Sequence, residues 1–273
     1  VSRPPICSER ATVFFPRYVA AASQALATVA ALEIMRGGVS AVDDLQGQAY
    51  ELLLGGGVGR ALDLSNEDDA TLKRYDTGHF AKAGQWDKVN RGKRGYYTAQ
   101  AKTIGHLLLM ARRLCEAGCG FVTIHAGYAG VWDMHADGNN LNMVDGMNAV
   151  GRSFDHAVAA FVEDLEARGL SDKIMLVATG EMGRTPRINK RGGRDHWGRL
   201  APLLMYGGGL PGGRIIGQSD KQGGEPATDA FGPKHLISTI MHTLFDIGQL
   251  RLVSGVPDQV MRLAANDPIA GLA

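Results

Sequence analysis

The sequence has little cysteine, almost no net charge and no long hydrophobic run, and each absence excludes a class of protein. Three cysteines, Cys7, Cys115 and Cys119, are too few for a disulfide framework. A formal net charge of +1 gives no field that would attract nucleic acid or an anionic membrane. No apolar stretch approaches the roughly 20 residues that a membrane-spanning helix needs. We therefore expect no nucleic-acid partner and no membrane span.

Familiar targeting and catalytic motifs are also missing. No three-part signal peptide is visible, and the chain begins with Val1 rather than Met, so we expect a removed leader or a fragment. The HExxH, GxSxG and paired CxxC motifs do not occur. The segment GGGLPG at 207–212 is followed by RIIG, which favours a strand, so a dinucleotide-binding loop is not expected.

The patterns that are present predict one α/β domain over residues 1–273. Residues 1–40 have no clear period and stay unassigned, whereas 76–95 is polar and favours a loop. A helix is expected to begin at Ser65, with acidic residues in its first turn. The hydrophobic spacing further predicts helices at 41–54, 97–117, 143–168 and 235–248, and buried strands at 121–125, 173–179 and 202–206. This order favours a mostly parallel sheet with helices on both faces, in which the three strands are neighbours.

Cys115 and Cys119 are four residues apart, near the end of the helix expected at 97–117. Two small core residues are the favoured interpretation. A redox pair or a metal pair is the alternative, so cysteine usage does not fix the compartment.

Chemistry-bearing residues follow two of the predicted strands. Ligands bind at the carboxyl ends of strands in open parallel sheets, so these loops should converge. Carboxylates with imidazoles suit Zn²⁺, Mn²⁺ or Fe²⁺. The alternative is that these residues are loop caps and surface ion pairs. For His125, at the end of the first strand, a buried core histidine is favoured over a further metal ligand. The candidates are Asp133 and His135 after the first strand, and Glu181, Arg184, Arg194, Asp195 and His196 after the second.

Several segments resemble one bacterial family. They are VWDMHADGNN, LVATGEMGRTPRIN, GRDHW and YGGGLPGGRIIGQSD, within a resemblance that covers about residues 41–250. The chain resembles domain-of-unknown-function family 1501, a branch of the alkaline phosphatase and sulfatase superfamily. The resemblance implies an alkaline-phosphatase-like α/β fold and an extracytoplasmic location, periplasmic or secreted.

The resemblance also implies a metal-dependent hydrolase of phosphate or sulfate esters, acting on a small-molecule or polysaccharide ester. Zn²⁺ or Mn²⁺ is the expected metal, with Ca²⁺ or Fe as alternatives. Arg184 and Arg194 would clamp an anionic oxygen. Asp195 would orient His196 or bind metal. Met182 stands where related enzymes carry a histidine. The implied metal ligands are Asp133, His135, Glu181, Asp195 and His196.

The front of the chain departs from the family. Members begin with a strand and a segment that supplies a metal Asp and the nucleophile, and nothing in residues 1–40 looks like it. Cys7, Ser8 and Thr12 are nucleophile types, but they follow no convincing strand. We therefore expect that the amino-terminal part of the family domain is missing or diverged, and that turnover is weak. The alternatives are a phosphomutase-like isomerase and a degenerate, non-catalytic binding or structural protein. The sequence does not give the oligomeric state.

Overall fold

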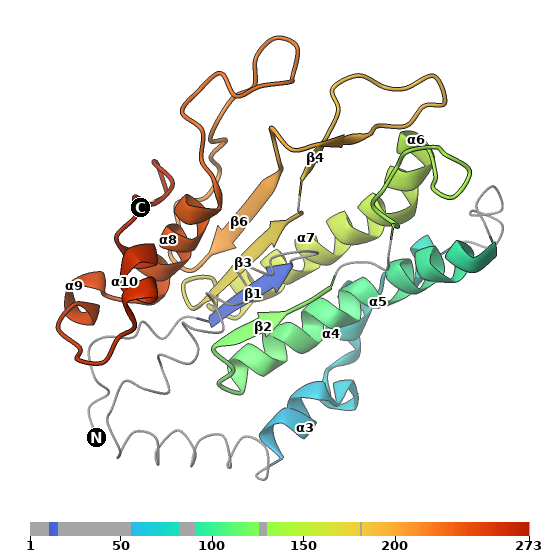
Figure 1. The fold of residues 1–273 in the computed structure, drawn as a ribbon. Coiled ribbons are helices and arrows are strands. Elements are labelled where there is room, and N and C mark those ends of the chain that lie inside the picture. Colours follow the sequence, from blue (N-terminus) through green and yellow to red (C-terminus); the bar gives the residue numbers. More distant parts are fainter. Residues whose placement is uncertain (1–10, 16–55, 82–90, 126–129, 181, 273) are drawn as a thin grey trace.

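One four-stranded sheet organises the part of the chain that can be described. The computed structural model describes residues 11–15, 56–81, 91–125, 130–180 and 182–272 (Figure 1). The strand order is β2-β1-β3-β6; β1 is parallel to β2 and to β3, whereas β6 is antiparallel to β3. A two-stranded antiparallel ribbon, β4 with β5, follows β3. The strands are β1 Ala11–Phe15, β2 Phe121–Thr123, β3 Ile174–Thr179, β4 Gly183–Arg184, β5 His196–Trp197 and β6 Leu203–Gly207.

Helices cover both faces of this sheet, as Figure 1 shows. The side chains of β3 alternate between two hydrophobic clusters, because successive strand residues point to opposite faces. Ile174, Leu176 and Ala178 pack with helices α5 and α7. Met175 and Val177 pack with α8, α9 and α10. The helices are α3 Gly57–Leu62, α4 Asp69–Arg74, α5 Arg91–Glu116, α6 Met143–Gly146, α7 Arg152–Ala167, α8 Pro233–Leu244, α9 Ile247–Leu250 and α10 Asp258–Ala264, with short 3₁₀ turns at Leu64–Asn66 and Gly78–Phe80 and a π-helical segment at Met147–Gly151.

The strand predictions need three corrections. Residues 11–15, where no strand was expected, form β1, which lies between β2 and β3, so these two are not neighbours. The segment at 121–125 is not a buried strand: β2 ends at Thr123 and is an edge strand, and Thr123 and His125 are exposed, so His125 is not a core histidine. The strand expected at 202–206 is β6, which is not buried: it forms the other edge of the sheet, and its Leu203 and Leu204 are 39% and 40% exposed.

The helix boundaries differ from the expected ones in four places. Helix α5 begins at Arg91, inside the segment 76–95 that favoured a loop. The helix expected at 235–248 ends at Leu244, because Phe245 is extended, and α9 follows from Ile247.

The helix expected from Ser65 begins at Asp69, because Asp68 is its N-cap and its side chain accepts from the Thr71 N–H at 2.8 Å. The helix expected at 143–168 is divided into α6, the π-helical segment and α7. The helix expected at 41–54 lies outside the described residues.

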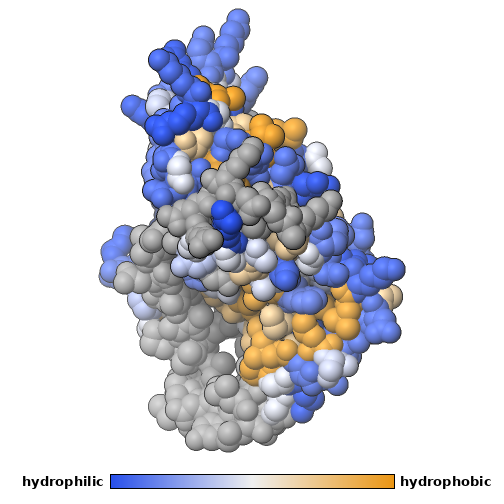
Figure 2. All heavy atoms as spheres, turned by 90° about the vertical axis from the view of Figure 1, so that its right-hand side faces the viewer, coloured by the Kyte–Doolittle hydropathy of each residue, from blue (hydrophilic) through white to orange (hydrophobic). Residues whose placement is uncertain are grey.

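Hydrophilic and hydrophobic side chains are distributed unevenly on the side of the molecule that Figure 2 shows. The upper part of this face is mainly hydrophilic, and hydrophobic side chains gather in its lower part. The segment before α6 from residue 130 and the ribbon of β4 with β5 lie at the upper level of the molecule (Figure 1). No helix in the described ranges is long and apolar enough to cross a membrane.

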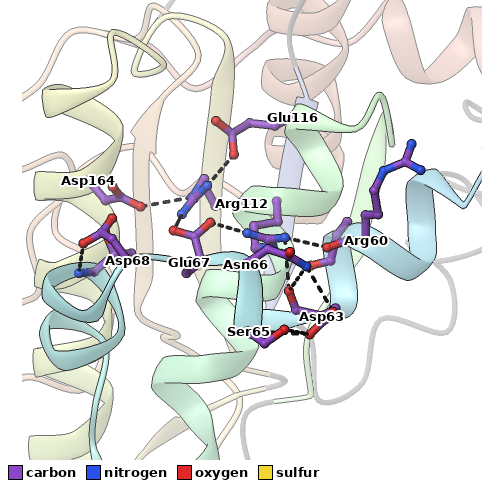
Figure 3. Close-up of polar contacts among 12 residues, drawn as sticks. Arg60, Asp63, Ser65, Asn66, Glu67, Asp68, Arg112, Glu116 and Asp164 are labelled. Carbon is purple, nitrogen blue, oxygen red and sulfur yellow. Dashed lines mark hydrogen bonds and ion pairs between the residues drawn. The ribbon is translucent and has the colours of Figure 1, made fainter.

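A buried charged network joins α5 and α7 to the turn that precedes α4 (Figure 3). The Arg112 guanidinium lies 2.9 Å from Oε2 of Glu67 and 3.0 Å from Oδ2 of Asp164, and it also contacts Glu116. Tyr75 donates to Oδ2 of Asp164 at 3.0 Å. Burial, with the Asp164 charge, raises the pKa of Tyr75 far above its ordinary value. The phenol therefore stays protonated as a donor.

This network predicts that stability falls in acid. Burial alone would raise the pKa of Glu67, but hydrogen bonds from Arg112 and Arg113 lower it below its ordinary value of 4.5. Such a carboxylate contributes stability that is present above the unfolded pKa and lost as pH falls through the folded pKa. We expect the free energy of unfolding to decrease below about pH 4.5, and to do so less steeply in Glu67→Gln. Urea titrations from neutral to acid pH measure both; identical pH profiles would contradict the prediction.

Candidate metal centre

Three potential metal ligands meet beyond the carboxyl ends of the parallel strands. Asp133 and His135 lie in the segment after β2, and His196 opens β5, after β3. One ligand atom from each lies within 4.8 Å of those of the other two. The Nε2 atoms of His135 and His196 are 3.1 Å apart, and Nε2 of His196 lies 3.4 Å from Oδ1 of Asp133. The structure thus brings together three of the predicted ligands.

Local backbone geometry presents these side chains. In the ribbon, Arg184 of β4 pairs with His196 of β5. On the other side, Ala136 has a left-handed φ of 56°, and its N–H donates to the Leu141 carbonyl at 3.1 Å, which closes a turn just after His135. Asp137 accepts two backbone N–H groups inside this turn. Burial would raise the pKa of Asp137, but these bonds hold it below its ordinary value.

The donor set, and two of its three donor separations, fit one divalent ion. Two nitrogens bound to a tetrahedral Zn²⁺ at about 2.0–2.1 Å would lie roughly 3.3 Å apart. The 3.1 Å and 3.4 Å separations in this group match that spacing. Two imidazoles with one carboxylate suit Zn²⁺ or Mn²⁺ by ligand type. Asp133, His135 and His196 would hold the ion.

Asp195 contacts His135, not His196. Its Oδ1 lies 3.3 Å from Nδ1 of His135, and its side chain is 64% exposed. A carboxylate on one ring nitrogen fixes the tautomer, so the other nitrogen, Nε2, keeps its lone pair for a metal. In this arrangement Asp195 orients a ligand, and it is not a member of the three-residue group.

Two arginines near these ligands in sequence have unpartnered donors among the described residues, and one of them, Arg184, contacts a ligand directly. Nη2 of Arg184 lies 2.6 Å from Oδ1 of Asp133. Among the described residues, Nη1 of Arg184 and Nε of Arg194 are buried without a hydrogen-bond partner. A buried guanidinium N–H without a partner is costly, and an anionic oxygen would satisfy it. Glu181, the remaining predicted ligand, lies outside the described residues.

Sequence reasoning missed two residues that join the loops, Asn189 and Gly193. Asn189 Nδ2 donates to the His135 carbonyl at 3.0 Å. A Cβ at Gly193 would lie 2.2 Å from the carbonyl carbon of His135. The available signal was the turn-forming composition of NKRGG, which predicts a turn but not its partner.

Cys115 and Cys119 lie away from this group as free, half-buried thiols. Burial, with the neighbouring Cys119 thiol, raises the pKa of Cys115 to about 12, and burial also raises the pKa of Cys119. The thiolate form that binds metal or attacks a disulfide is therefore disfavoured. Cys115 packs against the cluster between the sheet and α5, as expected for a small core residue.

The fold and this group define an α/β protein with a carboxylate–histidine cluster beyond the carboxyl ends of its parallel strands. Residues 20–271 match the family described as protein of unknown function (DUF1501), so the chain belongs to that family. The predicted membership is confirmed, over a longer range than residues 41–250. No curated protein and no solved structure matches the chain.

Proposed function

We propose that the chain is a metal-dependent hydrolase of phosphate or sulfate esters, of the alkaline phosphatase and sulfatase type. One observation carries the proposal: Asp133, His135 and His196 place ligand atoms within 4.8 Å of one another, and Arg184, which contacts Asp133 through Nη2, has a buried Nη1 without a partner among the described residues. Metal ligands next to an anion clamp are what cleavage of an anionic ester requires. The parallel order β2-β1-β3, with helices on both faces, supports the alkaline-phosphatase-like fold as part of the proposal.

The roles of the residues follow from their contacts. A bound divalent ion would polarise the ester and lower the pKa of an attacking oxygen. Arg184 holds Asp133 with Nη2 and leaves Nη1 for an anionic oxygen, and Arg194 offers Nε. Asp195 holds the Nδ1 side of His135. The Thr185 hydroxyl donates to the Arg187 carbonyl and accepts from the Asp195 N–H, so it is committed to the loop.

The proposal predicts that metal binding depends on the two histidines. The double variant His135→Ala/His196→Ala should lose tight Zn²⁺ or Mn²⁺ binding, because one carboxylate remains of the three-residue group. Calorimetric titration of metal-stripped protein measures the affinity. His106→Ala/His242→Ala, which removes two histidines outside the group, is the matched control. Equal affinity in both double variants would show that the metal assignment is wrong.

Turnover separates the enzyme from its alternatives. Because no nucleophile has been identified, metal-loaded protein should cleave a panel of aryl phosphates and sulfates only weakly, and chelation should abolish that activity. Tight metal binding without turnover on any ester would favour a non-catalytic binding protein. The extracytoplasmic location stays a prediction from the family resemblance.

A further inference from the structure

The metal group is divided between two loops, and the side chain of Asn189 joins them. In its own turn, Oδ1 of Asn189 accepts from the backbone N–H of Arg191 and of Gly193, at 3.0 Å each. Across the gap, Nδ2 donates to the carbonyl oxygen of His135 at 3.0 Å. This amide supports the turn that precedes His196, beside backbone bonds of Asn189 with Gly192 and Gly193, and fastens the turn to the backbone of His135.

The backbones of the two loops also touch directly. The N–H of Arg194 donates to the Met134 carbonyl at 2.9 Å, and the N–H of Met143 donates to the Gly192 carbonyl at 2.9 Å. The bond from Asn189 adds a third contact between the same two loops. It reaches His135, whose ring lies against that of His196. The separation of the two rings therefore depends on how these loops are docked.

We propose that Asn189 is a positioning residue for the metal group, which sets the distance between the His135 and His196 rings through its bond to the His135 carbonyl. Asp195 holds the ring of His135, and Asn189 holds its backbone. Partners outside the ligand set commonly change metal affinity about 10–100-fold. The expected change in metal affinity rests on the proposed function. The positioning of the two rings does not depend on it.

Asn189→Asp isolates the bond across the loops. The new carboxylate keeps an oxygen for the N–H groups of Arg191 and Gly193, but it has no donor for the His135 carbonyl. The matched control is Asn266→Asp, because Nδ2 of Asn266 also donates only to backbone carbonyls, those of Arg262 and Leu263, beside α10. Thermal unfolding of both variants establishes that they are folded.

Two readouts test the proposal. In metal-free protein, the ring centroids of His135 and His196 are 4.7 Å apart, so proton NMR should show contacts between the rings in the wild type and in Asn266→Asp, but not in Asn189→Asp. In titrations, Asn189→Asp should bind Zn²⁺ about 10–100-fold more weakly, although its added negative charge alone would tighten binding of a cation.

The outcomes separate this inference from the proposed function. Absence of the ring contacts from the wild type, or their persistence in Asn189→Asp, would overturn the positioning role. Loss of the contacts in Asn189→Asp, together with a wild type that binds no Zn²⁺, would support the positioning role and refute the metal function.

Discussion

Replacing Arg112 with alanine should destabilise the fold by about 3–5 kcal/mol, the usual cost of breaking a buried ion pair by removing one partner. Arg112 is 1% exposed, and its guanidinium contacts the buried carboxylates of Glu67 and Asp164. When the arginine is removed, these buried carboxylates lose their main positive partner, and their desolvation is offset less well. Arg113 and Arg168 still contact Glu67, and Arg168 also contacts Asp164, so we expect the lower end of that range.

Urea unfolding of Arg112→Ala and of Arg199→Ala measures this effect against a matched control. Arg199 also pairs with a glutamate, Glu225 at 3.6 Å, but the two side chains are 68% and 49% exposed. An exposed pair contributes about 0–1 kcal/mol, because water solvates both charges after the pair is broken. Similar losses in the two variants would mean that the network around Arg112 contributes no more than a surface pair.

The sheet could be predicted only where local sequence decides the strand. KIMLVAT is a continuous hydrophobic run because β3 is buried on both faces, and such a run is typical of a central strand. ATVFF at 11–15 is equally apolar, but a run of five residues does not distinguish a strand from other buried segments. The position of β1 depends on its pairing with β2 and β3, more than 100 residues away in sequence. That pairing leaves no local signal.

In the candidate site, too, local sequence predicted some features, whereas others depend on contacts between distant segments. Asp133, His135 and His196 were predictable because they come after strands of one sheet, and the carboxyl ends of parallel strands meet at one edge whichever strand lies between them. The partner of Asp195 was not predictable. His135 and Asp195 are 60 positions apart, and their contact depends on how the turn at 185–195 is docked. The partner of Glu67 was not predictable either. Its position in the sequence favoured a helix start, but its carboxylate contacts the distant Arg112.

Gly193→Ala should remove metal binding while most of the fold remains. The added Cβ would lie 2.2 Å from the carbonyl carbon and oxygen of His135 and 2.7 Å from the Met134 oxygen. These are backbone atoms, so no side chain can rotate away and the two loops must separate. Separation breaks the bond from the Arg194 N–H to Met134 and moves His196 away from His135.

We expect the Zn²⁺ affinity of Gly193→Ala to fall at least about 100-fold, the upper range for changes outside the ligand set, because this clash displaces a ligand rather than reorienting one. Gly198→Ala is the matched control: it adds the same methyl group five residues later, where no atom lies within 4 Å. Its affinity should equal that of the wild type. Zn²⁺ titration and thermal unfolding of both variants measure the two effects. Wild-type affinity in Gly193→Ala would show that the close approach of these loops does not hold the metal group together.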